Sequence, residues 1–293
     1  MGHPAQAGFF LCRNPTLDRI FAITAVDSRP SITAVISRFQ ARPGAAMSKD
    51  RFSHASDDYQ RYRPRYSSSL FNEIAGLAGR HELAWDCGCG SGQASVALAQ
   101  YFQRVLATDL SFAQVLEAPS HKGIHYAAAR AEQPPLGAES VDLILVAQAL
   151  HWFDFQSFFA EVERVLRHRG VFVAVTYNLL TVAPEIDALV HELYFDLLKG
   201  CWDAERRHVE EAYRNIPLPY EPIPGAGAGH SLQAQWSVDH LLGYLRTWSG
   251  VKQYQSRYAK DPVAFVEPAL RAAWQDGERA VDWPLTALVR RKP

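Results

Sequence analysis

Between residues 69 and 177, short apolar runs alternate with segments in which apolar residues recur at helical spacing. The apolar runs predict strands at 83–86, 105–109, 125–129, 140–146 and 171–177. The helical patterns occupy 69–79, 93–102 and 155–168. Strands that alternate with helices across short connections indicate a parallel sheet with helices on both faces. The predicted fold class of this part is therefore α/β, with a doubly wound sheet.

The strongest helical pattern lies at 155–168, where bulky apolar residues form one continuous face. Asp154 is suited to cap the beginning of this helix, and Gly170 is suited to end it. Glu163 and Arg167 stand four residues apart, so they are expected to form an ion pair on the helix surface.

Residues 180–276 interrupt the alternation and carry helical patterns instead. Helices are expected to begin at Pro184, at Ser237 and at Asp261. The alternating pattern at 282–290 predicts a terminal strand. We therefore expect one domain over residues 47–293, with a helical cap at about 180–276 that is inserted before the last strands.

Residues 1–46 differ from the rest of the chain by their many arginines, few acids and interrupting prolines. A transit peptide would share the arginines, but Asp18 and Asp27 count against one. Met1 and Met47 are the two methionines of the chain, and capped periodic sequence starts just after the second. We expect Met47 to be the native start and residues 1–46 to be an extension of little or no order.

The composition excludes several classes of protein. The net charge of −1 gives no sign of the basic surface that a nucleic-acid-binding protein needs. No apolar run approaches the roughly 20 residues of a membrane-spanning helix. Cys87 and Cys89 could form half a metal site, but no second pair stands at a suitable spacing, so no metal is expected. The four scattered cysteines favour a reducing compartment, and we expect a cytoplasmic monomer or homodimer.

The central motif of the chain is the stretch 83–93, LAWDCGCGSGQ, in which an apolar run ends in an acid and three glycines follow at alternate positions. Glycine tolerates φ > 0 and has no Cβ, so a ligand can lie against the backbone there. The N–H groups at the start of the following helix would face that ligand. The stretch is therefore typical of a strand–turn–helix unit that binds a nucleotide.

The spacing and the charge of this turn discriminate between nucleotides. A dinucleotide fingerprint needs G-x-G-x-x-G, whereas Gly88, Gly90 and Gly92 follow the spacing G-x-G-x-G. Asp86, two residues before Gly88, would repel a pyrophosphate and would suit a cationic group such as an α-amino group. S-adenosylmethionine has an amino acid end, a ribose and an adenine but no phosphate, so the charge favours this ligand.

Asp109 ends the second predicted strand, 19 residues after Gly90. At about this separation from a glycine turn, an acid reaches the ribose hydroxyls of a bound nucleotide. The alternative role is that of a helix cap, for which Ser111 competes. We interpret Asp109 as the residue that accepts hydrogen bonds from the ribose.

These motifs resemble those of the class I S-adenosylmethionine-dependent methyltransferases, in the type 11 branch. Residues 86–92 resemble motif I of that family, and 105–109 is similar to its acid-terminated second strand. Further similar segments lie at 131–132, 140–146, 148–152, 164–170, 248–250 and 283–285. Within the branch, the chain is most similar to the trans-aconitate and cantharidin methyltransferase-like group. The resemblance runs from about Ser48 to the end of the chain and implies a Rossmann-like, seven-stranded, mostly parallel sheet.

The resemblance also implies that S-adenosylmethionine is the cofactor and that a defined set of residues binds it. The set is Asp86, Gly88, Cys89, Gly90, Gly92, Asp109, Leu110, Ala131, Glu132 and Gln148. Relatives often carry an Asp just before the Ala-Glu pair, where it meets the adenine amino group, but this chain has Arg130. Because a guanidinium cannot accept a hydrogen bond, that contact falls to the Ala131 backbone or to Glu132.

The acceptor must be oriented toward an already activated methyl group and shielded from water. A carboxylate acceptor needs no base, whereas a phenol, thiol or amine can need one, and His151 is the well-placed candidate. The alternative is that His151 and Trp152 only wall the cofactor pocket. The substrate-facing candidates are Tyr62, Arg63, Trp152, Tyr177, Arg246 and Trp248. An arginine would pair with an acid, while the aromatic residues equally allow an apolar acceptor.

The predicted function is the transfer of a methyl group from S-adenosylmethionine to a small-molecule acceptor, with a carboxylate oxygen as one candidate. One alternative is an NAD-dependent oxidoreductase on a similar sheet, against which Asp86 and the glycine spacing count. The other alternative is a protein that binds S-adenosylmethionine without catalysis.

Overall fold

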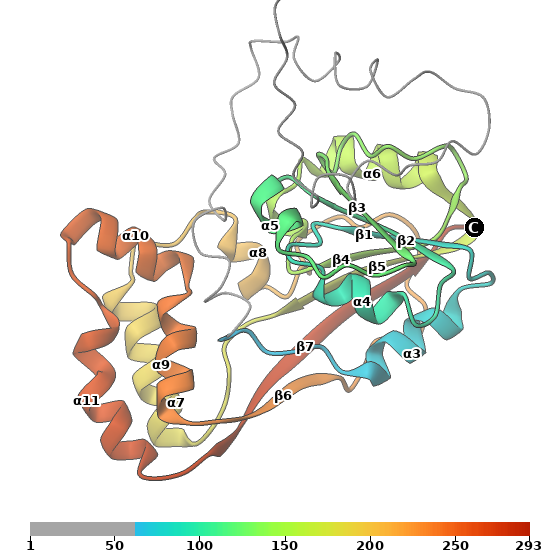
Figure 1. Cartoon of the computed structure of the whole chain (residues 1–293). Helices are drawn as coiled ribbons and strands as arrows, with labels where there is room; N and C mark the ends of the chain where they lie inside the picture. The colour runs from blue at the N-terminus through green and yellow to red at the C-terminus, as the bar shows by residue number, and fades with distance from the viewer. Residues whose placement is uncertain (1–61) are drawn as a thin grey trace, which may run out of the picture. The chain divides into compact units, whose positions relative to one another are not determined.

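The computed structural model describes residues 62–293 of the chain (Figure 1). The expectations for residues 1–46 and for Met47 lie outside the described residues. Among residues 62–293, none of the helices combines the length and the hydrophobicity that a membrane span requires.

A seven-stranded sheet with the order β3-β2-β1-β4-β5-β7-β6 forms the centre of this part of the chain. The strands are β1 (Leu83–Cys87), β2 (Arg104–Asp109), β3 (Ile124–Ala128), β4 (Val141–Ala147), β5 (Leu166–Tyr177), β6 (Ser231–Trp236) and β7 (Arg279–Arg291). Strands β1 to β5 pair in parallel, and β7 runs antiparallel to both β5 and β6. The prediction of a mostly parallel, seven-stranded α/β sheet is confirmed.

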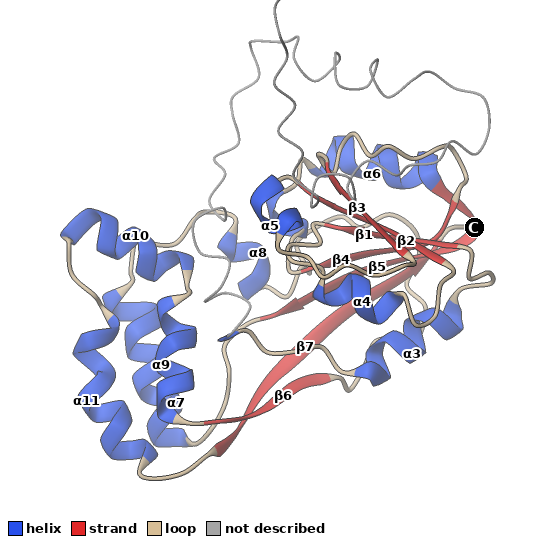
Figure 2. Ribbon diagram, viewed as in Figure 1, coloured by secondary structure: helices blue, strands red, loops and turns tan. Residues whose placement is uncertain are grey.

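Helices cover both faces of the sheet, and further helices gather beyond one end of it (Figures 1 and 2). The helices beside the sheet are α3 (Ser68–Leu77), α4 (Gln93–Leu98), α5 (Phe112–Leu116), the short 3₁₀ helix η2 (Leu150–Trp152) and α6 (Phe155–Val165). The others are α7 (Pro184–His191), the π-helical turn η3 (Glu192–Leu197), α8 (Arg206–Glu210), α9 (Val238–Arg246), α10 (Ser249–Tyr258) and α11 (Val263–Trp274). Helices α7, α9, α10 and α11 pack together as the cap.

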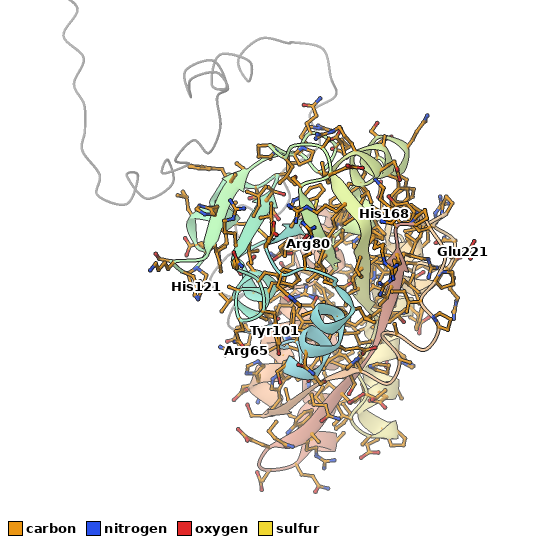
Figure 3. The ribbon with its side chains drawn as sticks, turned by 90° about the vertical axis from the view of Figure 1, so that its right-hand side faces the viewer. Arg65, Arg80, Tyr101, His121, His168 and Glu221 are labelled. Carbon is orange, nitrogen blue, oxygen red and sulfur yellow. The ribbon has the colours of Figure 1, made fainter. Side chains whose placement is uncertain are left out.

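The hydrophobic core has two parts, one on each face of the sheet, because successive side chains of a strand point to opposite faces. In β4, Leu143 and Leu145 join the core under α3 and α4, whereas Ile144 and Val146 join the core under α6. All four side chains are buried, as expected for a strand covered on both sides. Other charged and polar side chains lie on the outside, and Figure 3 labels exposed examples such as His121.

The helix predicted at 155–168 ends earlier, at Val165. Asp154 caps its beginning as expected, since its side chain accepts a hydrogen bond from the backbone of Ser157. The expected end at Gly170 is wrong, because residues 166–177 form the long strand β5. A Cβ on Gly170 would lie 2.7 Å from the side chain of Leu166, so glycine allows the irregular start of this strand.

The expected ion pair between Glu163 and Arg167 is also wrong. Arg167 lies in β5, where its Nη1 atom contacts Asp142 Oδ1 at 2.6 Å and Glu82 Oε2 at 3.0 Å. Glu163 instead pairs with Lys292 at 3.1 Å. Once the chain leaves the helix at Leu166, the four-residue spacing no longer places the two side chains on one helix face.

Residues 180–276 contain three elements that the pattern did not predict: the edge strand β6 and the helices α8 and α10. The predicted helix starts are confirmed, since Pro184 opens α7, Ser237 caps α9 and Asp261 accepts a hydrogen bond from the first residue of α11. Strand β6 therefore lies within the range 180–276 and pairs with β7 through one edge only.

Candidate functional site

The glycine turn after β1 is held against the end of β2. The N–H groups of Gly88 and Cys89 both donate to the carbonyl oxygen of Thr108, at 2.8 and 3.0 Å. Gly92 has φ +83°, and a Cβ there would lie 2.5 Å from the Tyr126 hydroxyl oxygen. This position therefore needs glycine both for its backbone conformation and for the space below the turn. Near Gly90, by contrast, the closest atom to an added Cβ would be 3.7 Å away, in Gln114.

Asp86 places a buried carboxylate directly below this turn. Its side chain is fully buried, and Oδ2 accepts a hydrogen bond from the Ser95 hydroxyl at 2.5 Å. The other oxygen, Oδ1, has no hydrogen-bond partner among the described residues. The pKa of Asp86 is raised from 3.8 to about 7, mainly by burial and also by the nearby Asp109, while the Ser95 hydrogen bond opposes the rise. An orphaned buried acceptor of this kind suits a cationic donor.

Asp109 lies at the end of β2, at the side of the glycine turn. Its Oδ2 atom accepts the backbone N–H of Gly90 at 2.8 Å, and its Oδ1 atom accepts that of Ser111, also at 2.8 Å. Ser111, and not Asp109, is the N-cap of α5, because its hydroxyl accepts from the backbone of Gln114. The two backbone bonds fix the carboxylate beside the turn.

The other predicted cofactor residues lie at the neighbouring strand ends. Leu110 follows β2 and is half-exposed, while Ala131 follows β3 and is buried. Glu132 accepts the backbone N–H of Asp154 at 3.0 Å and lies 3.3 Å from the Nε atom of Arg130. The Glu132 side chain therefore tethers the start of α6 and offsets the charge of Arg130.

Gln148 connects the ends of β4 and β5. Its Nε2 atom donates to the carbonyl oxygen of Tyr177 at 2.8 Å, and its Oε1 atom accepts from the Thr176 hydroxyl at 2.7 Å. Its backbone has φ +56°, an uncommon conformation for a residue with a side chain. The side chain is thus held in place where the sheet meets the cap.

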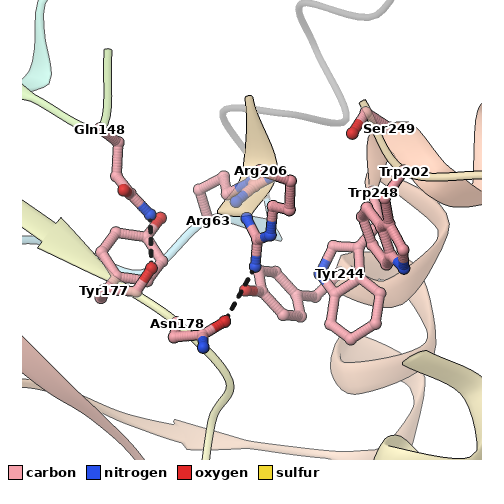
Figure 4. A pocket seen from close by; sticks show the side chains of 9 residues that line it. All are labelled: Arg63, Gln148, Tyr177, Asn178, Trp202, Arg206, Tyr244, Trp248 and Ser249. Atoms are coloured by element: carbon pink, nitrogen blue, oxygen red, sulfur yellow. Dashed lines mark hydrogen bonds between the residues drawn. The ribbon is translucent and has the colours of Figure 1, made fainter. Parts of the chain in front are cut away.

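A polar cavity lies at this junction and is lined by residues of the sheet ends and the cap (Figure 4). The lining residues are Arg63, Gln148, Tyr177, Asn178, Trp202, Arg206, Tyr244, Trp248 and Ser249. The cavity measures about 40 Å³, so an organic ligand could enter only if lining side chains moved apart. Two arginines and several aromatic rings thus meet at the carboxyl end of β5.

Arg206, the first residue of α8, is a cation of this cavity that hydrogen bonds hold on two sides. Its Nε atom donates to the Tyr194 hydroxyl at 2.8 Å, and its Nη2 atom donates to Asn178 Oδ1 at 3.1 Å. The guanidinium carbon lies 5.4 Å from the ring centroids of both Tyr194 and Trp202. Among the described residues, no carboxylate pairs with Arg206. Its guanidinium has five N–H donors, so three remain beyond these two bonds.

Of the six substrate-facing candidates, Arg63, Tyr177 and Trp248 line the cavity. The guanidinium of Arg63 lies over the ring of Tyr244, 5.2 Å from its centroid. The other three candidates, Tyr62, Arg246 and Trp152, do not line it.

Each of these three contacts another part of the chain. Tyr62 packs edge-on against His240 of α9. Arg246 forms ion pairs with Asp261 and Glu267 at 2.9 and 2.7 Å, and Trp152 packs against the ring of His151.

Sequence reasoning missed Asn178, Trp202, Arg206, Tyr244 and Ser249 as lining residues. Arg206 lies in a short, charged segment with no apolar periodicity, so the pattern provided no signal for it. The one available clue was the strand-end position of Asn178, directly after the predicted fifth strand.

His151 is buried beside this region, and its Nδ1 atom lies 2.8 Å from the Tyr213 hydroxyl. The pKa of His151 is lowered from 6.5 to about 3, mainly by burial and also by the nearby Arg206 and His208. The imidazole is therefore neutral at physiological pH and holds an added proton only weakly.

Several known proteins are similar to this chain in sequence. A family model described as a methyltransferase domain matches residues 85–174. A Dictyostelium discoideum protein named as a candidate methyltransferase is 32% identical over 252 residues, covering 83% of this chain and 95% of the relative. A Saccharomyces cerevisiae protein named as a candidate S-adenosylmethionine-dependent methyltransferase is 33% identical over 126 residues, covering 40% of this chain and 43% of the relative.

A solved structure is similar to this chain over a comparable length. It is described as a candidate type II methyltransferase from Anaeromyxobacter dehalogenans and is 44% identical in sequence, with a TM-score of 0.72. The match covers 78% of this chain and 98% of the solved chain.

Proposed function

The chain belongs to the class I S-adenosylmethionine-dependent methyltransferases, and we propose that it methylates a carboxylate oxygen of a small organic acid. S-adenosylmethionine is the methyl donor of the family. Membership in this family sets aside the oxidoreductase alternative.

We assign the amino acid end of S-adenosylmethionine to Asp86 and the glycine turn, and the ribose to Asp109. The orphaned Oδ1 atom of Asp86 supports the first assignment, because an ammonium group would supply the missing donor. The anchored carboxylate of Asp109 supports the second. Leu110, Ala131, Glu132 and Gln148 are assigned to the remaining walls of the cofactor site.

The single observation that favours a carboxylate acceptor is the guanidinium of Arg206. It lines the cavity, is held by two hydrogen bonds, and has no carboxylate partner among the described residues. An arginine binds a carboxylate through two parallel N–H···O bonds, which fixes orientation as well as charge. The rings of Trp202 and Trp248 provide apolar walls for the rest of such an acid.

The bound cofactor supplies a sulfonium-activated methyl group, and the chain's residues orient the acceptor toward it. One carboxylate oxygen forms the new C–O bond as the methyl–sulfur bond breaks, the electron pair stays on sulfur, and no proton moves. An ionised acid therefore needs no general base. Arg206 would hold the acid in the reactive orientation, while the cap excludes water.

His151 is best assigned to the wall of the pocket. With a pKa of about 3, its imidazole would be a weak base for a phenol or an amine. A carboxylate acceptor is consistent with that property, because the reaction uses no base. Resemblance to the trans-aconitate and cantharidin methyltransferase-like group is compatible with this proposal, as are a cytoplasmic location and a monomeric or homodimeric state.

The proposal is tested by incubating the protein with methyl-tritiated S-adenosylmethionine and a panel of benzoate, cinnamate, fumarate and succinate. We expect a labelled product that releases tritiated methanol in mild base, as a methyl ester does. Base-stable label on phenols or amines, with none on acids, would contradict a carboxylate acceptor. Binding of the cofactor without any transfer would favour the non-catalytic alternative.

A further inference from the structure

The cap contains a π-helical turn, η3, directly after α7. Its irregularity is visible in the backbone, because the N–H of Leu198 bonds the carbonyl oxygen of Leu193, five residues earlier. Such turns are rare in proteins, and those that occur often lie at functional sites. In this chain the turn includes Tyr194, whose side chain is 1% exposed and contacts Arg206.

The hydroxyl of Tyr194 takes part in two hydrogen bonds of fixed direction. It donates its one proton to Glu210 Oε1 at 2.6 Å, and its oxygen accepts from Arg206 Nε at 2.8 Å. Burial raises the pKa of Tyr194 above its ordinary value of 10, so the proton stays on the hydroxyl at neutral pH. Because Glu210 accepts that proton, a lone pair of the hydroxyl faces the guanidinium.

The surroundings restrict the guanidinium further. Asn178 accepts from Nη2 at 3.1 Å (Figure 4). Together with the bond from Nε to Tyr194, this contact holds the guanidinium on two sides. The Tyr194 ring stacks on the Trp202 ring at 4.4 Å between centroids, and the guanidinium lies over both rings. A bound carboxylate would therefore meet a guanidinium whose rotation has already been set.

We propose that Tyr194, held by Glu210, is the positioning residue that sets the rotation of Arg206 for the acceptor carboxylate. This inference rests on the proposed function, since it assigns Arg206 to the acceptor. In a bidentate interaction, two N–H groups must point at the two carboxylate oxygens at the same time. A guanidinium that is free to rotate would have to be ordered when the acid binds, and this loss of entropy would reduce the binding free energy.

The alternative to a positioning role is that Tyr194 only fills space in the core. Tyr194→Phe separates the two roles, because phenylalanine keeps the ring that stacks on Trp202 but lacks the hydroxyl. Tyr258→Phe is the matched control, since Tyr258 is half-exposed on α10 and does not line the cavity. Glu210→Gln is a second variant, because it changes the partner of the hydroxyl and leaves Tyr194 itself intact.

The first test uses the acid from the panel that wild-type protein labels best. We expect Tyr194→Phe to raise KM for this acid about tenfold, with the Kd for S-adenosylmethionine unchanged. Glu210→Gln should raise KM less, and Tyr258→Phe should match wild type. The preference for binding the acid over its methyl ester should shrink in Tyr194→Phe by a similar factor. Equal KM and equal preference in Tyr194→Phe and Tyr258→Phe would overturn the inference and leave the proposed function standing.

The second test needs no acceptor. The Nε–H signal of Arg206 in an ¹H–¹⁵N spectrum, identified by its absence in Arg206→Lys, should exchange slowly with water in wild type. It should broaden or vanish in Tyr194→Phe and persist in Tyr258→Phe. A persistent, slowly exchanging signal in Tyr194→Phe would overturn the inference. If no acid were labelled while this signal behaved as expected, the proposed function would fail, whereas the hydrogen-bonded contact itself would remain.

Discussion

The Oδ2 atom of Asp109, at the end of β2, accepts the backbone N–H of Gly90 at 2.8 Å. This bond joins the glycine turn to the acid 19 residues later and keeps both at one edge of the sheet. The glycine turn and Asp109, the two most specific features of the sequence, therefore lie together in the fold. Their separation in sequence is the one found between a glycine turn and the acid that binds the ribose of a nucleotide.

Asp109→Ala should weaken the binding of S-adenosylmethionine about tenfold or more, because a charge-assisted hydrogen bond is worth roughly 1.5–3 kcal/mol. Titration calorimetry measures the Kd. Asp276→Ala provides the control, since Asp276 is an exposed carboxylate between α11 and β7. An unchanged Kd in Asp109→Ala would remove this residue from the cofactor site.

Asp86→Asn should stabilise the cofactor-free protein more at high pH than at low pH. Burial holds the pKa of Asp86 at about 7 in the fold, against an ordinary value of 3.8. The folded state therefore binds the proton more tightly, and this group's contribution to stability is lost as the pH rises between those two values. Asp86→Asn should therefore increase the free energy of unfolding more at high pH than at low pH. This difference should reach at least about 1 kcal/mol between the two pKa values, since one pKa unit corresponds to about 1.4 kcal/mol.

Urea unfolding of both proteins at pH 5 and pH 8 measures this difference, with Asp276→Asn as the control. If Asp86→Asn changed the free energy of unfolding equally at both pH values, Asp86 would ionise at its ordinary pKa.

Gly92→Ala should destabilise the protein by more than about 1 kcal/mol, because left-handed backbone and steric overlap are both costly for alanine. The added Cβ would lie 2.5 Å from the Tyr126 hydroxyl oxygen. Gly76→Ala in α3 is the matched control, since no atom lies within 4 Å of a Cβ there and alanine favours the helix. Thermal unfolding compares the two variants. Equal melting temperatures would show that a Cβ at Gly92 does not clash with Tyr126.

Methylation of an acid should show no inflection near pH 6.5 in kcat/KM when S-adenosylmethionine is saturating. His151 has a pKa of about 3 and is not required as a base. His151→Gln should therefore preserve the shape of the pH profile. A wild-type inflection near the ordinary histidine pKa that disappears in His151→Gln would restore His151 as the general base.

The elements that carry the cofactor assignment could be predicted because their signals are local. The acid, the alternate glycines and the strand ending at Asp109 all lie within one short stretch of sequence. Strand β6 was missed although apolar residues alternate with Gln233 and Gln235 between Leu232 and Trp236, which is the pattern of a half-buried strand. Helix α6 was extended too far because Leu166, the first residue of β5, continues the apolar face of the helix and no helix-breaking residue precedes Gly170.

The acceptor residues were harder to predict because their roles arise from tertiary contacts. Arg206 is one of several charged residues in a short helix, and only the fold brings it to Asn178 and Tyr194. Arg246 was an equally reasonable candidate by sequence, but Asp261 and Glu267 bind it in the cap. A cation's partners cannot be read from its position in the chain when those partners lie in other elements.

Arg206→Met is the decisive variant for a carboxylate acceptor, because it removes the cation and keeps an unbranched side chain. With the acid that wild-type protein labels best, KM should rise about ten- to a hundredfold, matching the roughly 1.5–3 kcal/mol of hydrogen bonds to a charged group. The Kd for S-adenosylmethionine should not change. Arg207→Met, the exposed neighbour in α8, is the control and should match wild type. An unchanged KM in Arg206→Met would contradict a carboxylate acceptor held by this guanidinium.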